Sequence, residues 1–384
     1  MIPRIIGNYN IKGSLKEVLE NHSGNINNTY IAVFVDEEGV ERKYLIQKIN
    51  TTVFTEPYKL MKNIEGVTSY LKKQAMIEGD TQHRVLEVLK TKDNKLLCYV
   101  QDSGERDYYR IYEYIDGAVS YDCSEDPHVV YNTGKAFGHF QRLLRNYPIN
   151  RLKETIKDFH ATDKRYKKLI EDIKIDSEGR VKEVADEIVF ILMREDLYSL
   201  ITEQLGSEEI PLRVTHNDTK VNNVLMNKET GEYLAVIDLD TVMPGSLLFD
   251  YGDGVRSTAS TAKEDEKDLS KVSLNLELFK AYTDGYLSEM AAYMTFDEVS
   301  LMGESIRIIA LELAIRFLND YINGDTYFKI SYPKHNLDRA RNQLALVEDI
   351  ERKLDIMNSY IMESYKKYKD PDQVQKLTKS PDTQ

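Results

Sequence analysis

The residues best placed for chemistry lie between positions 212 and 240. This stretch reads LRVTHNDTKVNNVLMNKETGEYLAVIDLD, in which an apolar strand runs into the polar loop His216-Asn217-Asp218-Thr219-Lys220. A carboxylate on such a loop, here Asp218, can align a hydroxyl group and accept its proton when the oxygen attacks phosphorus. Lys220, two residues further on, could reach the phosphoryl group that is transferred. The loop therefore predicts phosphoryl transfer, with Asp218 and Lys220 as catalytic residues.

A hairpin after this loop is expected to bring two more oxygen donors together. The strand that follows Asn223 and the strand that ends on Asp238 are separated by a turn rich in Asn, Thr and Gly. If Met226 pairs with Ala235, the constant sum of paired positions in an antiparallel ladder places Asn223 opposite Asp238. Mg²⁺ takes few protein oxygens and completes its octahedron with water and nucleotide phosphates. We therefore predict a magnesium site at Asn223 and Asp238.

The spacing His-x-Asp-x-Lys-x-x-Asn is that of the catalytic loop of protein kinases, in which the Asp is the base and the Asn holds a metal. The alternative is a solvated turn between strands, since Asn and Asp favour turns by bonding to their own backbone. A plain turn does not explain an aspartate that the hairpin places opposite Asn223. We expect His216 to pack and hydrogen-bond to hold the loop, rather than to transfer a proton.

Strands dominate the first hundred or so residues. Runs rich in β-branched and aromatic residues predict strands at 30–35, 43–49, 96–100 and 108–115. The first two strands flank the turn residues 36–39 and form a hairpin. After this hairpin, apolar residues recur at helical spacing over 58–73, which predicts a helix.

Amphipathic helices dominate the rest of the chain. Their apolar residues recur at helical spacing over 129–145, 183–205, 271–293, 298–323 and 338–366. Short strands and turns are expected to interrupt this helical region between about 212 and 256, which is where functional loops tend to lie. The polar end of the chain, 370–384, carries two prolines and is expected to be a frayed tail.

Composition excludes several classes of protein. With 384 residues, 41% of them hydrophobic and 30% charged, the chain has the composition of a globular protein. Its formal net charge of −13 repels a phosphate backbone, and no basic stripe is present, so we expect no nucleic-acid partner. The apolar runs are too short to span a bilayer, so we expect no membrane partner. The two cysteines, Cys98 and Cys123, and a start without a basic-then-apolar run favour a reducing, cytoplasmic location.

Three motifs give the chain a family resemblance. The loop HNDTKVNNVLM is followed by VIDLDTVMPG and FDYGDGVR, and together these resemble the aminoglycoside phosphotransferase and choline kinase superfamily, within it most closely the N-acetylhexosamine 1-kinases. The likeness extends to QKINTTVF, to FHATDKRY at 159–166 and to ELAIRFLNDYINGDTYF at 312–328. It implies an α+β, protein-kinase-like fold of two lobes, in which a small antiparallel sheet of five strands and a large helical lobe enclose a nucleotide cleft. Residues 1–115 would bind nucleotide, and residues 116–369 would hold the catalytic and substrate-binding groups.

The resemblance also implies roles for individual residues. Asp218 matches the catalytic base, and Asn223 and Asp238 match the metal ligands. Asp240, in the same IDLD run, would bridge to the metal or support its ligands. The segment from Glu113 to Ile115 matches the hinge, whose backbone carbonyl at 113 and amide at 115 would bind adenine.

The phosphate-contacting part of the small lobe departs from the kinase pattern. The segment GNINNT at 24–29 has one glycine where G-x-G-x-x-G has three, so side chains such as Asn27 and Thr29 would supplement the backbone donors. An overlay on the kinase V-A-I-K motif puts Gln47 where the lysine should be, with Lys48 on the opposite face of the strand. Either Gln47 contacts phosphate or a bulge rotates Lys48 inward. The same choice decides whether a lysine can pair with Glu65.

Candidates for contacts with a sugar follow from the resemblance as well. They are Arg316 and Asp320 on one predicted helix, and His160, Arg165 and Tyr166 in an earlier segment. Arg316 and Asp320 are one helical turn apart and share a face. They form either an exposed ion pair or a hydrogen-bonding edge for ring hydroxyls or an acetamido group. His160 would form part of the other wall, or would be a surface histidine with satisfied hydrogen bonds.

These features predict an ATP- and Mg²⁺-dependent kinase that phosphorylates the anomeric hydroxyl of an N-acetylhexosamine to give the sugar 1-phosphate. One alternative is a kinase for another small hydroxyl acceptor, such as an aminoglycoside, choline, a hydroxy amino acid or another sugar. The other is a nucleotide-binding regulator without turnover, suggested by Gln47 and the single glycine of the phosphate segment. The sequence leaves open the sugar epimer, the nucleotide and the oligomeric state.

Overall fold

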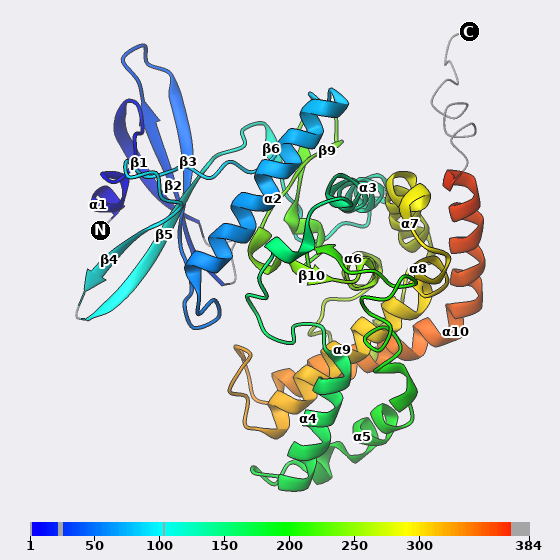
Figure 1. Ribbon diagram of the computed structural model, residues 1–384. Coiled ribbons are helices and arrows are strands. Elements are labelled where there is room, and N and C mark those ends of the chain that lie inside the picture. The colour runs from blue at the N-terminus through cyan, green and yellow to red at the C-terminus, as the bar shows by residue number, and fades with distance from the viewer. Residues whose placement is uncertain (1, 22–25, 103, 370–384) are drawn as a thin grey trace.

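The computed structural model describes residues 2–21, 26–102 and 104–369, which form a small strand-rich lobe and a large helical lobe (Figure 1). The small lobe holds a five-stranded antiparallel sheet with the order β1-β2-β3-β5-β4. Its strands are β1 (Ser14–Asn21), β2 (Asn28–Val35), β3 (Glu41–Lys48), β4 (Cys98–Asp102) and β5 (Glu105–Glu113). The short helix α1 (Ile2–Ile6) precedes the sheet, and α2 (Pro57–Glu78) runs between the sheet and the large lobe. The predicted α+β, protein-kinase-like fold is confirmed.

The edge strand β1 is the strand that the sequence pattern did not predict. Most of its side chains are exposed, and only Leu15, Val18 and Asn21 are half-buried. Charged residues separate these positions, so the alternation that marks a half-buried strand is weak. The strand is defined instead by its pairing with β2, which only the folded sheet provides.

The hairpin between β2 and β3 keeps a regular register. The carboxylate of Asp36 accepts the backbone N–H groups of Glu38 and Val40, at 3.1 and 2.9 Å, which fixes the turn. From this turn the two strands pair without a bulge as far as Thr29 opposite Gln47. The regular register decides which β3 side chains face the large lobe.

Helix α2 joins the two lobes through a shared hydrophobic core. It begins at Pro57, and Gly79 caps its end in a left-handed conformation with φ 71°. One contiguous apolar cluster contains residues of α2, of the large-lobe helix α3 (Pro127–Leu144) and of the turn at 237–242, which includes IDLD. Among its members are Leu60, Ile64, Val67, Phe140, Leu143, Leu239 and Val242. The two lobes therefore share one core rather than only a flexible connection.

The large lobe consists mostly of helices. They are α3 (Pro127–Leu144), α4 (Thr162–Ile175), α5 (Ala185–Leu192), α6 (Leu247–Ala259), α7 (Leu276–Met290), α8 (Phe296–Ser300), α9 (Met302–Ile322) and α10 (His335–Lys369). Two small antiparallel sheets lie among them: β7 (Arg213–Thr215) pairs with β10 (Met243–Gly245), and β8 (Val224–Asn227) pairs with both β6 (Ala118–Val119) and β9 (Tyr233–Val236). In the part of the chain that the structure describes, no helix is both long and apolar enough to cross a membrane. The expected tail at 370–384 lies outside the described residues.

Two predictions for this lobe need correction. The helix predicted over 183–205 ends at Leu192, because the chain turns back and the hydroxyl of Tyr198 donates to the carbonyl of Ile191 at 2.7 Å. Residues 247–259, expected as irregular backbone, form α6. Ser246 caps this helix by accepting the N–H of Leu248, and nearly all of its residues are buried, so tertiary packing outweighs the two glycines in its sequence.

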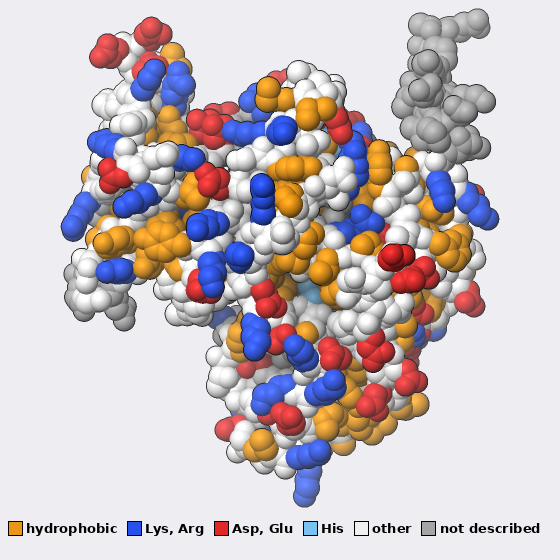
Figure 2. All heavy atoms as spheres, in the orientation of Figure 1, with side chains coloured by type: hydrophobic (Ala, Val, Ile, Leu, Met, Phe, Trp, Pro, Cys, Tyr) orange, Lys and Arg blue, Asp and Glu red, His pale blue; other side chains and the backbone are white. Residues whose placement is uncertain are grey.

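Charged side chains of both signs lie on the surface of the two lobes. On the face shown in Figure 2, basic and acidic side chains are interspersed over both lobes.

Helices α3 and α7 approach each other closely at two glycines. A Cβ on Gly134 would lie 2.2 Å from the carbonyl oxygen of Tyr282, and a Cβ on Gly285 would lie 2.0 Å from that of Tyr131. In both places the obstacle is backbone, which cannot rotate away. The crossing of these helices therefore requires glycine at both positions.

We expect Gly285→Ala to lower the free energy of unfolding by roughly 1–3 kcal/mol, because the methyl group forces α3 and α7 apart. Urea denaturation measures this loss. Lys280→Ala, at an exposed position of the same helix, is the matched control and should change stability by less than about 0.5 kcal/mol. Equal stabilities of Gly285→Ala and wild type would show that the two helices are not in close contact.

Candidate active site

Two aspartates of α6 hold the predicted catalytic loop in place. The carboxylate of Asp250 accepts the backbone N–H groups of His216 and Asn217, at 2.8 and 2.7 Å. Asp253 accepts the N–H of Thr219 at 3.0 Å. Both carboxylates are buried, and hydrogen bonds to buried charged groups are among the strongest in proteins. The backbone of the loop is therefore fixed from α6.

His216 completes this support. Its ring is fully buried and packs edge-on against Phe137 and Phe140. Its Nε2 lies 2.9 Å from the carbonyl oxygen of Ile237, and its Nδ1 accepts the N–H of Asp218 at 3.3 Å. Both ring nitrogens are thus used within the protein, as expected for a histidine that holds the loop.

Asp218 is at the centre of the side-chain contacts of the loop. Its Oδ1 lies 2.7 Å from Nζ of Lys220, and its Oδ2 accepts a hydrogen bond from Nδ2 of Asn223 at 2.9 Å. Because this amide nitrogen donates to Asp218, Oδ1 is the atom of Asn223 left for a cation. Burial opposes the charge of Lys220, but the carboxylates of Asp218 and Asp253 outweigh it and raise the pKa of the lysine. The structure brings together the three loop residues that the spacing singled out.

The hairpin that carries Asp238 differs by one residue from the expected register. Leu225 pairs with Ala235, and a bulge follows Leu225. Ile237 therefore stands opposite Asn223, and its N–H donates to the Asn223 carbonyl at 2.9 Å. Asp238 comes one residue later, with a left-handed φ of 59°, which turns the chain out of the strand. Asp238 remains next to Asn223 in space, but through this turn and not through cross-strand pairing.

The electrostatic surroundings of Asp238 favour a cation. The protein around the Asp238 carboxyl group raises its pKa well above the usual range. Partial desolvation is the largest cause, followed by the negative charges of Asp240 and Asp218. A carboxylate among like charges is stabilised in its ionised form by a bound cation. Asn223 pairs with the residue before Asp238, and an amide oxygen together with a carboxylate is a donor set of the kind that suits Mg²⁺.

Asp240 is held by an arginine that the sequence analysis did not single out. Arg110, on β5, is 1% exposed, and its Nη1 and Nη2 lie 2.6 and 2.8 Å from the two carboxylate oxygens of Asp240. Asn27 donates to the same carboxylate at 2.7 Å. The charge of Asp240 is therefore compensated within the protein, whereas that of Asp238 is left for a cation. Of the two roles predicted for Asp240, this geometry favours support of the ligands.

Gln47 connects Arg110 to the edge of the cleft. Its Oε1 accepts hydrogen bonds from Nε and Nη2 of Arg110, at 3.0 and 2.8 Å, and its Nε2 donates to the hydroxyl of Thr29 at 3.2 Å. Gln47 and Arg110 are cross-strand partners. Protein kinases have a lysine on β3, whereas here β3 offers a glutamine that lies beside an arginine of the neighbouring strand. The only sequence signal for it is a single basic residue within the aromatic run YYRIYEYI.

Lys48 points away from this network, so its predicted contact with the nucleotide is corrected. Neither of the ladders that β3 forms contains a bulge at this position. Strand alternation therefore turns Lys48 to the opposite face, where its Nζ pairs with Asp107 at 2.8 Å. Glu65 pairs with Lys90 at 2.7 Å, so no β3 lysine pairs with it. The glycine of the phosphate segment, Gly24, lies outside the described residues.

The predicted hinge lies at the end of β5. The N–H of Glu113 donates to Glu87 at 2.9 Å, and that of Tyr114 donates to Lys43 at 3.2 Å. The N–H of Ile115 makes no hydrogen bond within the described part of the chain. A backbone donor at this position is what the adenine contact predicted for Ile115 requires.

Two neighbouring cavities contain most of the predicted acceptor contacts. One, of about 570 Å³, is lined by Arg165, Arg316 and Asp320, and the other, of about 370 Å³, by His160 and by Asn217 of the catalytic loop. They share Asp158 and Lys164 in their walls. The smaller cavity therefore reaches the residue next to Asp218.

Arg316 is a cation without an acidic partner. Its guanidinium lies 5.7 Å from the ring centre of Phe159 and 5.5 Å from that of Phe328, and it forms no ion pair with Asp320 or any other described residue. Of the two arrangements predicted for Arg316 and Asp320, the exposed ion pair is therefore not formed. Burial lowers the pKa of Arg165, and the positive charge of the nearby Arg316 lowers it further. Two cations that repel each other line one cavity.

The side chains of Asp320 and Tyr166 make contacts within the protein that stabilise the large lobe. Asp320 accepts the backbone N–H groups of residues 326, 327 and 328 and so fixes the loop after α9, although it also lines the larger cavity. Tyr166 is buried and stacks on Tyr198 with ring centres 4.6 Å apart. The predicted contact of Tyr166 with substrate is corrected, because helix α4 turns this ring into the core of the large lobe.

His160 is held by a glutamate that the sequence analysis did not name. Its Nδ1 lies 3.0 Å from Oε1 of Glu312, and its ring stacks on Phe249 with centres 5.0 Å apart. The side chain is 10% exposed, so His160 is not a surface histidine. Its Nε2 is buried and has no partner within the described residues, so it can hydrogen-bond to a substrate. Glu312 lies one helical turn before Arg316 on α9, so in the sequence its spacing from Arg316 was the sign that it could face the same cavity.

The two-lobed fold, with a carboxylate, a lysine and an amide meeting at the junction of the lobes, is that of a kinase-like phosphotransferase. Residues 23–293 match the model of the phosphotransferase enzyme family, APH. The chain belongs to this family, which confirms the superfamily resemblance seen in its motifs.

Individual relatives are distant. The uncharacterized kinase-like protein D1044.1 of Caenorhabditis elegans is 29% identical over 130 residues, which make up 34% of this chain and 29% of that protein. A microcompartment-associated aminopropanol kinase is 16% identical, with 92% of this chain and 96% of that chain covered and a TM-score of 0.60. The amicoumacin kinase hAmiN, solved with AMP-PNP, Ca²⁺ and Ami, is 14% identical, with 98% and 96% covered and a TM-score of 0.54. At these identities the two structures support the fold alone.

We expect Arg110→Met to lower the free energy of unfolding at neutral pH by roughly 3–5 kcal/mol, because it leaves Asp240 buried without its cation. Urea denaturation of the single variants and of the double variant Arg110→Met/Asp240→Asn measures the coupling. The double variant should recover much of the loss, since no unpaired charge remains. Lys48→Met is the matched control: it breaks a part-exposed pair and should cost less than about 1 kcal/mol. Equal losses for Arg110→Met and Lys48→Met would contradict the assignment.

Proposed function

We propose that this chain is an ATP-dependent small-molecule kinase that transfers a phosphoryl group to a hydroxyl. The observation that carries the proposal is the placement of the Asp218 carboxylate between Nζ of Lys220 at 2.7 Å and Nδ2 of Asn223 at 2.9 Å. Asp238 lies close enough for the Asp218 charge to act on it. A base, a cation and two oxygen donors at one junction are the groups that phosphoryl transfer requires.

In the proposed reaction, the γ-phosphorus of ATP is the electrophile. Asp218 orients the acceptor hydroxyl and takes its proton while the new oxygen–phosphorus bond forms and the bond to the β–γ bridging oxygen breaks. Lys220 offsets negative charge on the transferred phosphoryl group. Asn223 and Asp238 would hold Mg²⁺, which supplies positive charge to the phosphate oxygens when bound. His216, Asp250 and Asp253 keep the loop in register during this step.

The proposed acceptor is a neutral sugar, an N-acetylhexosamine phosphorylated at its anomeric hydroxyl. The larger cavity offers the unpaired Arg316 and the buried Nε of Arg165, and the smaller offers Nε2 of His160. A polycationic acceptor would need free carboxylates, but all three acidic residues of the larger cavity are engaged. Asp158 pairs with Lys164, Asp172 pairs with Lys168, and Asp320 accepts three backbone N–H groups. In the larger cavity, these contacts favour the sugar over a polycationic aminoglycoside.

Asp218→Asn tests the reaction. We expect kcat for phosphorylation of N-acetylhexosamine to fall by roughly 10²–10⁴-fold, because the amide cannot take the hydroxyl proton. Nucleotide affinity, measured by calorimetry with Mg·ADP, should stay unchanged, since the amide keeps the shape of the side chain. Retained turnover in the variant would remove Asp218 from the proposed role, and absence of Mg·ATP consumption by the wild type with every acceptor would favour the regulator without turnover.

Arg316→Ala tests the acceptor. We expect KM for the preferred hexosamine to rise about 10–100-fold, with KM for ATP unchanged, because a charged hydrogen-bond donor to the sugar is lost. Arg307→Ala, on the same helix but paired with Glu304 and Glu351, is the control and should leave KM for the sugar unchanged. Assays with hexosamines, aminoglycosides and choline as acceptors identify the substrate class. A wild-type preference for an aminoglycoside or choline would reject the sugar while leaving the kinase proposal intact.

A further inference from the structure

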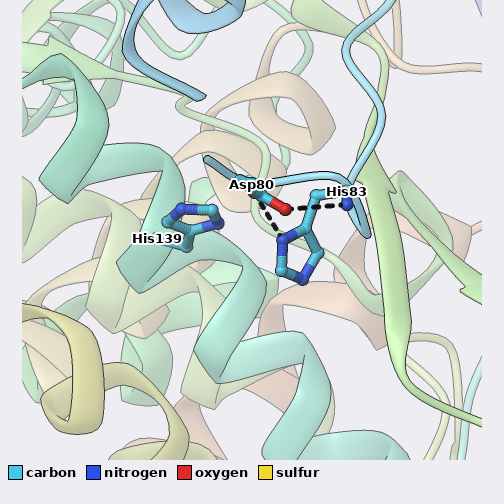
Figure 3. A group of neighbouring side chains, drawn as sticks. All are labelled: Asp80, His83 and His139. Atoms are coloured by element: carbon cyan, nitrogen blue, oxygen red, sulfur yellow. Dashed lines mark hydrogen bonds and ion pairs between the residues drawn. The ribbon is translucent and has the colours of Figure 1, made fainter. Parts of the chain in front are cut away.

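A compact group of metal-ligating side chains lies outside the candidate active site. Asp80 and His83 are on the bend that follows α2, and His139 is on α3 (Figure 3). Each of the three residues can place one ligand atom within 4.8 Å of the ligand atoms of the other two. None of them takes part in the contacts of Asp218, Asn223 or Asp238. The group comes from two segments that only the fold brings together.

The surroundings hold these side chains in place. Oδ2 of Asp80 lies 2.7 Å from Nδ1 of His83, and the ring of His83 stacks on Tyr233 with centres 4.0 Å apart. The hydroxyl of Tyr233 contacts Nδ1 of His139. Ring nitrogens that are oriented by such neighbouring groups are typical of histidines that bind metals. The ring of His139 is itself buried, at 6% exposure, so the proposed site lies largely within the protein.

We propose that Asp80, His83 and His139 form a binding site for a divalent transition-metal ion, with Zn²⁺ as the best match. Two imidazoles and one carboxylate are the ligand types that select zinc over magnesium, and water would complete a tetrahedral shell. Zinc–nitrogen bonds of about 2.0–2.1 Å place tetrahedral ligands about 3.4 Å apart. The ligand atoms, which lie within 4.8 Å of one another, would have to move closer together as an ion binds.

The position of the site gives the ion a structural role. The bend after α2 already contacts the large lobe, since the N–H of Arg84 donates to the carbonyl of Leu234 at 2.7 Å. Further along the same segment, Glu87 accepts the N–H of Glu113 in the hinge at 2.9 Å. An ion that joins Asp80 and His83 to His139 would add a bond between the small-lobe connection and α3. The bound ion would thereby hold the segment from Asp80 to Glu87, which hydrogen-bonds to the predicted hinge at Glu113.

Zinc binding by the full-length protein tests this proposal. The protein is treated with a chelator and titrated with ZnCl₂ in excess Mg²⁺, and bound zinc is measured by calorimetry and by elemental analysis. We expect the wild type to bind one Zn²⁺ more than His83→Gln, His139→Gln or Asp80→Asn. At this site the variants should bind Zn²⁺ at least about 100-fold more weakly. Changes to groups that only orient a metal ligand cost up to about 100-fold, and loss of a ligand itself should cost at least as much. Zinc should also raise the Tm of the wild type and not that of the variants.

A matched control separates the site from other zinc-binding groups. His128→Gln changes an exposed histidine at the start of the same helix, α3, and should bind zinc as the wild type does. Zinc bound at the active site or at a cysteine is common to all variants and cancels in the comparison. If His139→Gln fails to fold, His83→Gln and Asp80→Asn, at half-buried positions of the bend, still decide the question. Equal stoichiometry and affinity in the wild type and in these variants would overturn the proposal, as would an absence of zinc binding by the wild type.

Discussion

A buried ion pair joins the small lobe to the large lobe beside the candidate active site. Arg110 of the small lobe and Asp240 of the large lobe are almost without solvent contact, and each charge would be costly to bury alone. Their pairing fixes the position of β5 relative to the turn that carries Asp238. Gln47 of β3 and Asn27, just before β2, extend this network of hydrogen bonds to the other strands of the small lobe. It also divides the two aspartates of IDLD between separate tasks. Asp240 pairs with Arg110, whereas the negative charge of Asp238 has no such partner among the described residues.

The catalytic loop shows the same use of buried charge. Asp250 and Asp253 accept backbone N–H groups along the loop, and Asn217 adopts a left-handed backbone with φ 65° between them. Asparagine adopts this conformation more readily than most residues other than glycine, and here the hydrogen bond from its N–H to Asp250 holds it. The position of Asp218 is therefore set by the folded protein itself. If Asp218 acts in the proposed reaction, such preorganisation would help to stabilise the charge that develops.

The sequence predicted those parts of the protein that local pattern controls. Helix α2, the β2–β3 hairpin and the loop around Asp218 follow from periodicity, turn residues and spacing, and the family motifs supplied the two-lobed fold. What it missed depends on contacts between distant segments. Arg110 becomes important only when β5 lies beside β3, and the bulge after Leu225 shifts a register that sequence alone makes look regular. Tyr166 could be placed in the core only after the direction of α4 was known.

The core that α2 shares with the large lobe limits how the molecule can open. A swing of the whole small lobe would have to separate Leu60 and Ile64 from Phe140 and Leu239 and expose their apolar surfaces to water. The edge strand β1 carries a smaller penalty, because most of its side chains face solvent and it pairs with β2 alone (Figure 1). Motion of the small lobe should therefore be greatest at this outer edge of the sheet, with α2 and the strands next to it remaining in place.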